Sequence, residues 1–277
     1  MEHTSPAELY FFLRDYAGTE AYQDIVAPWM DKTGVAFREY LQPLRRYGQC
    51  TRTNDGFAEL LMEAYALSRV SDVLLVGFQS PLPEDVELPH VHSLHLKRGW
   101  PAITRPQYLA TFAALGMTEI EQDRFDPIFH EIVAVEQSPD PDAPIEILDI
   151  VWPGLMFDEL VFSRAGVRVR AGARHAVAGI AERSELHEVF LRRHRPTIDG
   201  SLGWGTNSQW RTFIRRDYVT ATAQHFNVDG DTDVSGNPTE EQSRLVRYRC
   251  KTDERDLPPD DENDRWIDDW RLTIGTR

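Results

Sequence analysis

Residues 125–136 read FDPIFHEIVAVE, a bend followed by a mostly apolar run. Asp126-Pro127 predicts a turn, because proline fixes φ and an aspartate side chain can hydrogen-bond its own backbone nearby. His130 then begins a strand, where its ring can meet both an apolar face and a polar partner such as Asp126. His130 and Glu131 therefore read first as structural residues that fix the turn to the strand.

Further strands follow this bend. The apolar runs 145–152 (IEILDIVW) and 160–172 (LVFSRAGVRVRAG) each predict a strand, and the loop SPDPDAP (138–144) separates the first strand from the second. In the first strand, alternation predicts that Ile132 and Ala134 share one face and that Glu131, Val133 and Val135 share the other.

Helices are expected before residue 117. Segments 5–16, 28–48, 54–70 and 105–116 have helical apolar spacing, and Pro43, Gly48 and Gly116 are their expected stops. The expected core stripe of the third segment is Phe57, Leu60, Leu61, Ala64, Tyr65 and Ser68. The run SDVLLVGFQS (71–80) predicts a short strand.

The C-terminal part is mixed in character. Segments 184–196 and 240–250 predict helices, and 253–269 predicts a surface tail anchored by Trp266 and Trp270. We therefore expect an α+β fold in three regions: a mainly helical region over 1–104, a small β-domain over 105–172, and a basic and aromatic, then acidic, region over 173–277.

Composition limits the function. The chain has 277 residues, 41% hydrophobic and 27% charged, with a formal net charge of −15. Such a charge argues against a nucleic-acid binder, because phosphate binding needs a positive surface. Residues 164–216 hold eleven Arg and four acids, whereas residues 229–277 hold fourteen acids and eight bases. The basic and acidic segments could dock on each other, or one could meet a partner.

Targeting and redox signals are sparse. No apolar stretch resembles a signal peptide or a membrane span, so we expect a cytoplasmic protein that does not contact membranes. Cys50 and Cys250 lack zinc spacing and any redox motif, and they read as free thiols.

A set of short motifs lies at fixed spacing over residues 107–170: Leu115-Gly116-Met117, Phe125-Asp126-Pro127, His130-Glu131, Gly154, and the Ala165, Val167, Val169 alternation. In these motifs the chain resembles the C-terminal β-domain of GrpE, the nucleotide-exchange factor of DnaK-type chaperones. The resemblance implies a compact β unit that docks a protein partner. The residues that we assign to partner binding on this basis are Phe125, Asp126, His130, Glu131, Gly154 and Arg164.

We therefore expect a protein-interaction module, without a cofactor, that docks a DnaK-type chaperone or another protein partner. Nothing local in the sequence indicates catalysis: a His-Glu pair is a weak catalytic signal without a nucleophile, and GxSxG, HExxH and a glycine-rich phosphate loop are missing. We predict no catalytic residues.

The alternative is an enzyme or small-ligand binder with an anionic-ligand pocket built from residues 203–218. There, amides and arginines could clamp a carboxylate or phosphate. The candidate residues of this pocket are Trp204, Asn207, Gln209, Trp210, Arg211 and Arg215. If the second half of this stretch is a helix, Arg211 and Arg215 lie one turn apart on one face. These tryptophans also read as core residues, and the arginines as partners of the acidic tail.

Two metal motifs are incomplete. His90, His92 and His95 lie close together, as zinc ligands can, but they also read as a polar strand end. Residues 229–240 (DGDTDVSGNPTE) match part of a calcium loop, yet Val234 stands where such a loop needs glycine. We predict no metal, and read 229–240 as a solvated acidic turn.

Overall fold

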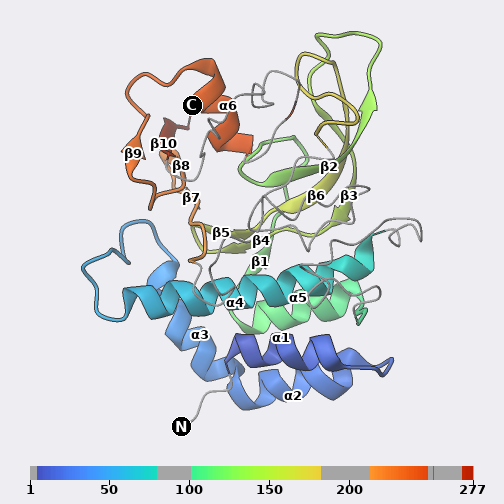
Figure 1. Ribbon diagram of the computed structural model, residues 1–277, viewed down its shortest axis with the longest axis vertical. Coiled ribbons are helices and arrows are strands. Elements are labelled where there is room, and N and C mark those ends of the chain that lie inside the picture. The colour runs from blue at the N-terminus through green and yellow to red at the C-terminus, as the bar shows by residue number, and fades with distance from the viewer. Residues whose placement is uncertain (1–4, 80–100, 182–212, 249–251, 253–269, 277) are drawn as a thin grey trace, which may run out of the picture. The chain divides into compact units, whose positions relative to one another are not determined.

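The computed structural model describes residues 5–79, 101–181, 213–248, 252 and 270–276. The chain divides into two compact units (Figure 1). Unit 1 takes its described residues from Met1–Glu119, Leu155–Asp158 and His187–Ile214, and unit 2 from Ile120–Gly154, Glu159–Leu186 and Arg215–Arg277. This division differs from the three expected regions, because residues 105–119 belong to unit 1.

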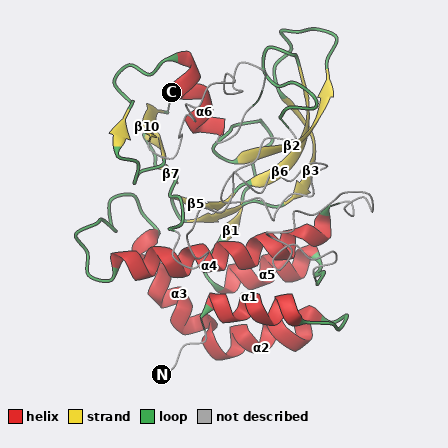
Figure 2. Ribbon diagram, in the orientation of Figure 1, coloured by secondary structure: helices red, strands yellow, loops and turns green. Residues whose placement is uncertain are grey.

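Unit 1 is mainly helical, as Figure 2 shows. Its longer helices are α1 (Pro6–Asp15), α3 (Val35–Leu41), α4 (Phe57–Leu75) and α5 (Arg105–Ala114). The chain before α3 is one helical run, with π-helical turns over Tyr22–Val26 and Met30–Gly34 on either side of α2 (Ala27–Trp29). Short 3-10 turns, Gln42–Leu44 and Val76–Phe78, follow α3 and α4. Strands β1 (Thr118–Glu119) and β4 (Leu155–Phe157) form an antiparallel pair.

Capping residues fix where α1 and α5 begin. Ser5 and Glu8 form a reciprocal capping box at α1, in which the Ser5 backbone N–H donates to the Glu8 carboxylate at 3.0 Å. Thr104 and Gln107 form the same box at α5. Proline stands within the first two positions of both helices, where its missing N–H costs nothing. The helix that was expected over 105–116 is confirmed, and Gly116, at φ 89°, follows its end.

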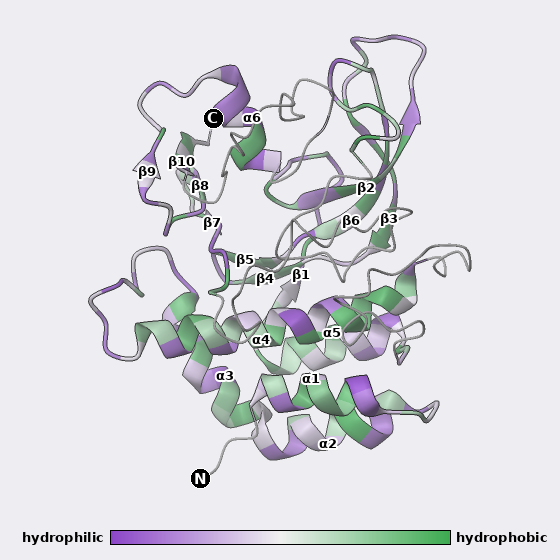
Figure 3. Ribbon diagram, viewed as in Figure 1, coloured by the Kyte–Doolittle hydropathy of each residue, from purple (hydrophilic) through white to green (hydrophobic). Residues whose placement is uncertain are grey.

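Helix α4 is the centre of unit 1 and packs against α1 and α3. All six residues of its expected stripe are buried. The strand that was predicted over 71–80 is wrong, because α4 continues to Leu75 and a 3-10 turn ends at Phe78. The whole run 64–76 is buried, and it includes the ion pair Arg69–Asp72 beside its apolar side chains. Figure 3 shows both hydrophobic and hydrophilic segments along α4. A buried helix thus continues where a short apolar run resembled a strand.

Unit 2 holds most of the strands. They are β2 (His130–Gln137), β3 (Glu146–Trp152), β5 (Leu160–Ser163), β6 (Ala165–Ala171), β7 (Tyr218–Val219), β8 (Ala223–Phe226), β9 (Thr232–Asp233) and β10 (Trp270–Gly275). Helix α6 (Glu240–Tyr248) confirms the helix that was expected near 240–250. The mixed α+β fold class is confirmed.

One sheet of unit 2 has the order β2-β6-β3, with β6 parallel to β2 and antiparallel to β3. The single strand that was expected over 160–172 is instead two strands, because the chain breaks at Arg164 between β5 and β6. Strand β5 lies in a different ladder, in the order β5-β7-β8-β10-β9. Residues 125–169 therefore supply strands to more than one ladder.

A β-bulge changes the faces of β2. The register against β6 shifts between Ile132 and Ala134, so Ile132 pairs with Val167 and Val135 pairs with Val169. Ile132 and Val135 consequently pack on the same apolar core. The predicted sharing of a face by Ile132 and Ala134 is wrong, since a bulge inserts one residue and inverts the alternation after it.

The core of this sheet is small and tightly packed. Ile132, Val167, Val169 and Ala171 form its centre, and Ile147 and Tyr248 pack against it. At one end the Trp152 indole lies over Gly166, its register partner, so that a Cβ at position 166 would overlap the ring. The Trp152 Nε1–H donates to the backbone carbonyl of Arg164 at 3.1 Å, which fixes the ring in place.

Near the C-terminus, the described chain resumes at Trp270. This residue begins strand β10, which pairs antiparallel with β8, and the tail expected over 253–269 lies outside the described residues. Trp266 and the helix expected over 184–196 lie outside the described residues.

Candidate functional site

The bend at 125–130 is held by Asp126. Its carboxylate accepts hydrogen bonds from the Ile128 backbone N–H at 3.1 Å and from the Gln224 side chain at 2.7 Å. Its backbone N–H and carbonyl both lie 3.1 Å from Nδ1 of His130. Asp126 therefore fixes the turn, the first residue of β2 and a residue of β8 together.

His130 is buried, and burial favours the neutral form of its imidazole. Burial lowers the pKa of its ring, and the Arg164 guanidinium lowers it further, whereas the Asp126 and Gln122 backbones oppose this shift. A neutral Nδ1 can accept the Asp126 N–H, while a protonated Nδ1 would have to donate to the Asp126 carbonyl. The geometry thus suits a structural histidine.

The other residues assigned to partner binding also have internal contacts. The Phe125 ring stacks on His130 at a centroid distance of 5.8 Å and lies 5.9 Å from the Tyr248 ring. Gly154 permits close approach, because a Cβ there would lie 2.5 Å from the Ala165 backbone nitrogen. Side chains of His130, Glu131 and Arg164 are at most 2% exposed. They hold unit 2 together and leave its surface to other residues.

Arg164 belongs to a buried cluster with Asp217 and Arg215, called here the arginine–aspartate cluster. Arg164 donates to one carboxylate oxygen of Asp217 at 3.1 Å, and Arg215 lies 3.5 Å from the other. That second oxygen also accepts the Asn227 backbone N–H at 2.7 Å. A buried carboxylate so placed offsets the cost of burying two guanidinium groups.

This cluster also ends helix α6. Arg164 donates to the carbonyls of Arg247 and Tyr248, at 3.1 and 3.2 Å, and Arg215 donates to the Val246 carbonyl at 3.1 Å. Those carbonyls belong to the last turn of α6. Carbonyls of a last helical turn have no N–H donor within the helix, and they carry the negative end of the helix dipole. The two arginines satisfy them and tie α6 to the strands.

The alternative anionic-ligand pocket falls mostly outside the described residues. Trp204, Asn207, Gln209, Trp210 and Arg211 are among those not described. Arg215 is described, and its guanidinium contacts Asp217 and α6. The chain is not helical over 213–217, so the helical placement considered for Arg215 is wrong.

The sequence analysis did not identify Asp217. This residue contacts both Arg164, which was assigned to partner binding, and Arg215, which was assigned to the anionic-ligand pocket. The signal was an acidic residue directly after two basic ones, in Arg215-Arg216-Asp217. Arg216 turns away from this cluster and forms a bidentate pair with Asp229, with both N–O distances 2.7 Å. Basic and acidic segments of the sequence therefore meet inside unit 2 at this pair.

The most exposed apolar feature of unit 2 is strand β3. It pairs only with β6 among the described residues and is an edge strand. Among its aliphatic side chains, Ile150 is exposed and three are half-buried, one of which, Ile147, packs against the core of the sheet. We call these four residues the aliphatic edge: Ile147, Leu148, Ile150 and Val151. Ile150 is 38% exposed, the one large exposed hydrophobic residue among those described in unit 2.

Charged pairs lie beside the aliphatic edge. Asp149 on β3 pairs with Arg168 on β6 at 2.6 Å, and Arg170 on β6 pairs with Glu136 on β2 at 2.7 Å. All four side chains are about half exposed. Such pairs add little to stability, about 0–1 kcal/mol each, and they form a polar border beside the aliphatic edge.

A polar cleft of about 220 Å³ lies between the segment after β6 and helix α6. Arg174, Arg244 and Arg247 line it, but Arg174 pairs with Asp142 and Arg244 with Glu240. Acidic partners thus offset two of its three positive charges, which leaves the cleft less suited to an anion.

Among the described residues, no group of three or more His, Cys, Asp or Glu side chains is placed so that it could hold a metal ion. Asp229 and Asp233 of the partial calcium loop pair with Arg216 and Arg271. His90, His92 and His95 lie outside the described residues. None of the described helices combines the length and apolar character needed to cross a membrane.

Comparisons with known protein families, with curated proteins and with solved structures found no match for this chain.

Proposed function

We propose that the chain is a protein-interaction protein whose unit 2 docks a polypeptide partner along β3. The aliphatic edge carries this proposal. Most large apolar side chains of unit 2 are buried, whereas β3 keeps four aliphatic side chains in contact with solvent. Exposed apolar side chains grouped on a sheet edge are typical of interaction sites.

Features of β3 favour a side-chain interface over strand addition. Its register shifts twice, between Ile147 and Asp149 and between Ile150 and Trp152. Bulges disturb the regular row of backbone groups that an added strand would need. A partner would then bury the aliphatic edge and meet the Asp149–Arg168 pair at its border, which supplies orientation.

The resemblance of residues 107–170 to the GrpE β-domain supports a DnaK-type chaperone as the partner. In that case the chain binds the chaperone and speeds release of its nucleotide. The buried Asp126–His130 bend and the arginine–aspartate cluster then serve this function indirectly, because they fix the strands that present the aliphatic edge.

Replacing Ile150 by lysine is the direct test. We expect the affinity of the chain for a purified DnaK-type chaperone to fall at least tenfold, about 1.4 kcal/mol, because a charge replaces an apolar contact. Binding is measured by pull-down and by titration, with and without ADP, together with the rate of nucleotide release.

Val35→Lys is the matched control, since Val35 is 80% exposed and belongs to unit 1. This variant should bind the chaperone as tightly as the unmodified chain does. Both variants should unfold at the same thermal midpoint as the unmodified chain. If the unmodified chain neither binds the chaperone nor changes nucleotide release, the chaperone assignment is wrong. Equal affinities for the Ile150 and Val35 variants would remove β3 as the docking site.

A further inference from the structure

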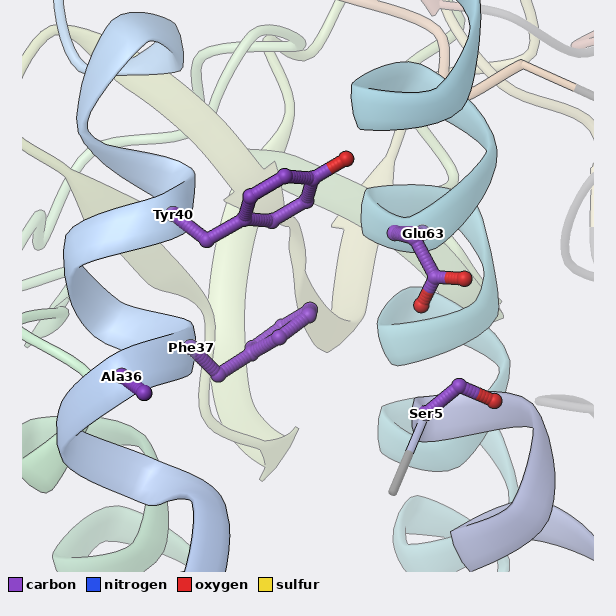
Figure 4. Close-up of a pocket in the computed structure, with 5 residues that line it drawn as sticks. All are labelled: Ser5, Ala36, Phe37, Tyr40 and Glu63. Carbon is purple, nitrogen blue, oxygen red and sulfur yellow. The ribbon is translucent and has the colours of Figure 1, made fainter. Parts of the chain in front are cut away.

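Unit 1 contains a small pocket between α3, α4 and the start of α1, shown in Figure 4. Its volume is about 130 Å³, and Ser5, Ala36, Phe37, Tyr40 and Glu63 line it. Drug-sized ligands occupy pockets of about 300–1,000 Å³. A pocket this small accommodates the end of one side chain and not a cofactor.

One side of the pocket is aromatic. The rings of Phe37 and Tyr40 project from α3 toward α4, with their centroids 5.9 Å apart and their planes tilted by 33° (Figure 4). Phe37 is buried, whereas Tyr40 is 42% exposed. Aromatic faces attract organic cations through the ring quadrupole, by about 0.5–2 kcal/mol.

The opposite side carries a carboxylate. Glu63 on α4 is half-buried, and it forms no hydrogen bond or ion pair with any other described residue. Burial raises the pKa of Glu63, and the like charge of Glu8 raises it further. Burial likewise raises the pKa of Tyr40, with additions from Glu63 and Glu59. The charged groups that shift these two pKa values are all acidic, which favours a cation over an anion near Glu63.

We propose that this pocket is a subsite for a lysine side chain of a partner polypeptide. The ammonium group would contact the Glu63 carboxylate, and its methylene chain would lie against Phe37 and Tyr40. The small volume of the pocket, about 130 Å³, favours the compact ammonium of lysine over the larger, planar guanidinium of arginine. This inference concerns unit 1 alone and does not depend on docking at β3.

The probe is lysine capped as its Nα-acetyl methylamide, titrated into the full chain and followed by NMR. Capped norleucine, which has the same apolar stem without the charge, and capped arginine are the comparison ligands. We expect the lysine probe to bind at least tenfold more tightly than norleucine and more tightly than arginine. Equal binding of lysine and norleucine would overturn the proposal, and tighter binding of arginine would overturn the choice of lysine.

The Glu63→Gln variant separates a binding role from a structural one. We expect lysine binding to fall at least tenfold while the thermal midpoint stays the same or rises. The raised pKa means that ionised Glu63 destabilises the folded state near neutral pH, so removing the charge relieves this cost.

Glu39→Gln is the matched control, since Glu39 is exposed on α3, does not line the pocket, and is not among the charges that shift the pKa of Glu63 or Tyr40. It should keep lysine binding within about twofold, as expected for a solvent-screened charge. The proposal fails if Glu63→Gln retains full affinity, or if it loses binding and stability together.

Discussion

Replacing Asp217 by alanine is expected to lower the free energy of unfolding of unit 2 by about 3–5 kcal/mol. The substitution leaves the guanidinium groups of Arg164 and Arg215 buried without their shared carboxylate, and it removes the acceptor of the Asn227 N–H. The two arginines would then turn toward solvent and release the last turn of α6. Denaturant unfolding gives the change in free energy, and hydrogen exchange over 240–248 reports the release of the helix.

Asp233→Ala is the control for this experiment. Asp233 pairs with Arg271 at 3.4 Å, and both side chains are at least 42% exposed. Exposed pairs contribute about 0–1 kcal/mol, so this variant should stay close to the unmodified chain. A loss below 1 kcal/mol for Asp217→Ala would show that the cluster does not support the fold as described.

Gly166→Ala is the second large effect. A Cβ at this position would overlap the Trp152 indole, which is fully buried and held by its bond to the Arg164 carbonyl. Overpacking of a core costs about 1–3 kcal/mol, and the rigid ring places this site at the upper end of that range. Denaturant unfolding of the variant measures the loss.

Two further variants show whether the overlap causes this loss. At Gly236 a Cβ would meet no heavy atom within 4 Å, so Gly236→Ala should change stability by less than about 0.5 kcal/mol. In the Trp152→Leu background the ring is gone, and Gly166→Ala should then cost much less than it does alone. Additive losses in the double variant would show that Trp152 is not what restricts position 166.

Local signals in the sequence were sufficient for much of unit 1. Helix α1 lies within the segment 5–16 that was expected to be helical, and the stripe of α4 is buried as expected. The wrong prediction of a strand at 71–78 has a physical cause. A short apolar run is compatible with either a fully buried helix or a buried strand, and only tertiary packing decides between them. No turn residue precedes Ser71 to end the helix.

Unit 2 depended on contacts that sequence spacing does not encode. The bulge after Ile132 reverses which side chains of β2 face the core, and no residue type in the sequence indicates that a bulge occurs there. The break between β5 and β6 coincides with Arg164, whose partners Asp217 and α6 lie more than fifty residues away in sequence. For the same reason, the burial of His130 and Arg164 could not be predicted from their spacing in the sequence.

The proposed docking of a DnaK-type chaperone on β3 is tested most directly by amide hydrogen exchange of the chain with and without the purified, ADP-bound chaperone. We expect slower exchange over Glu146–Trp152 and the adjoining Ala165–Ala171 in the complex, with the helices of unit 1 unchanged by this contact. Binding that leaves exchange over Glu146–Trp152 unchanged, or the absence of any binding, would contradict the account.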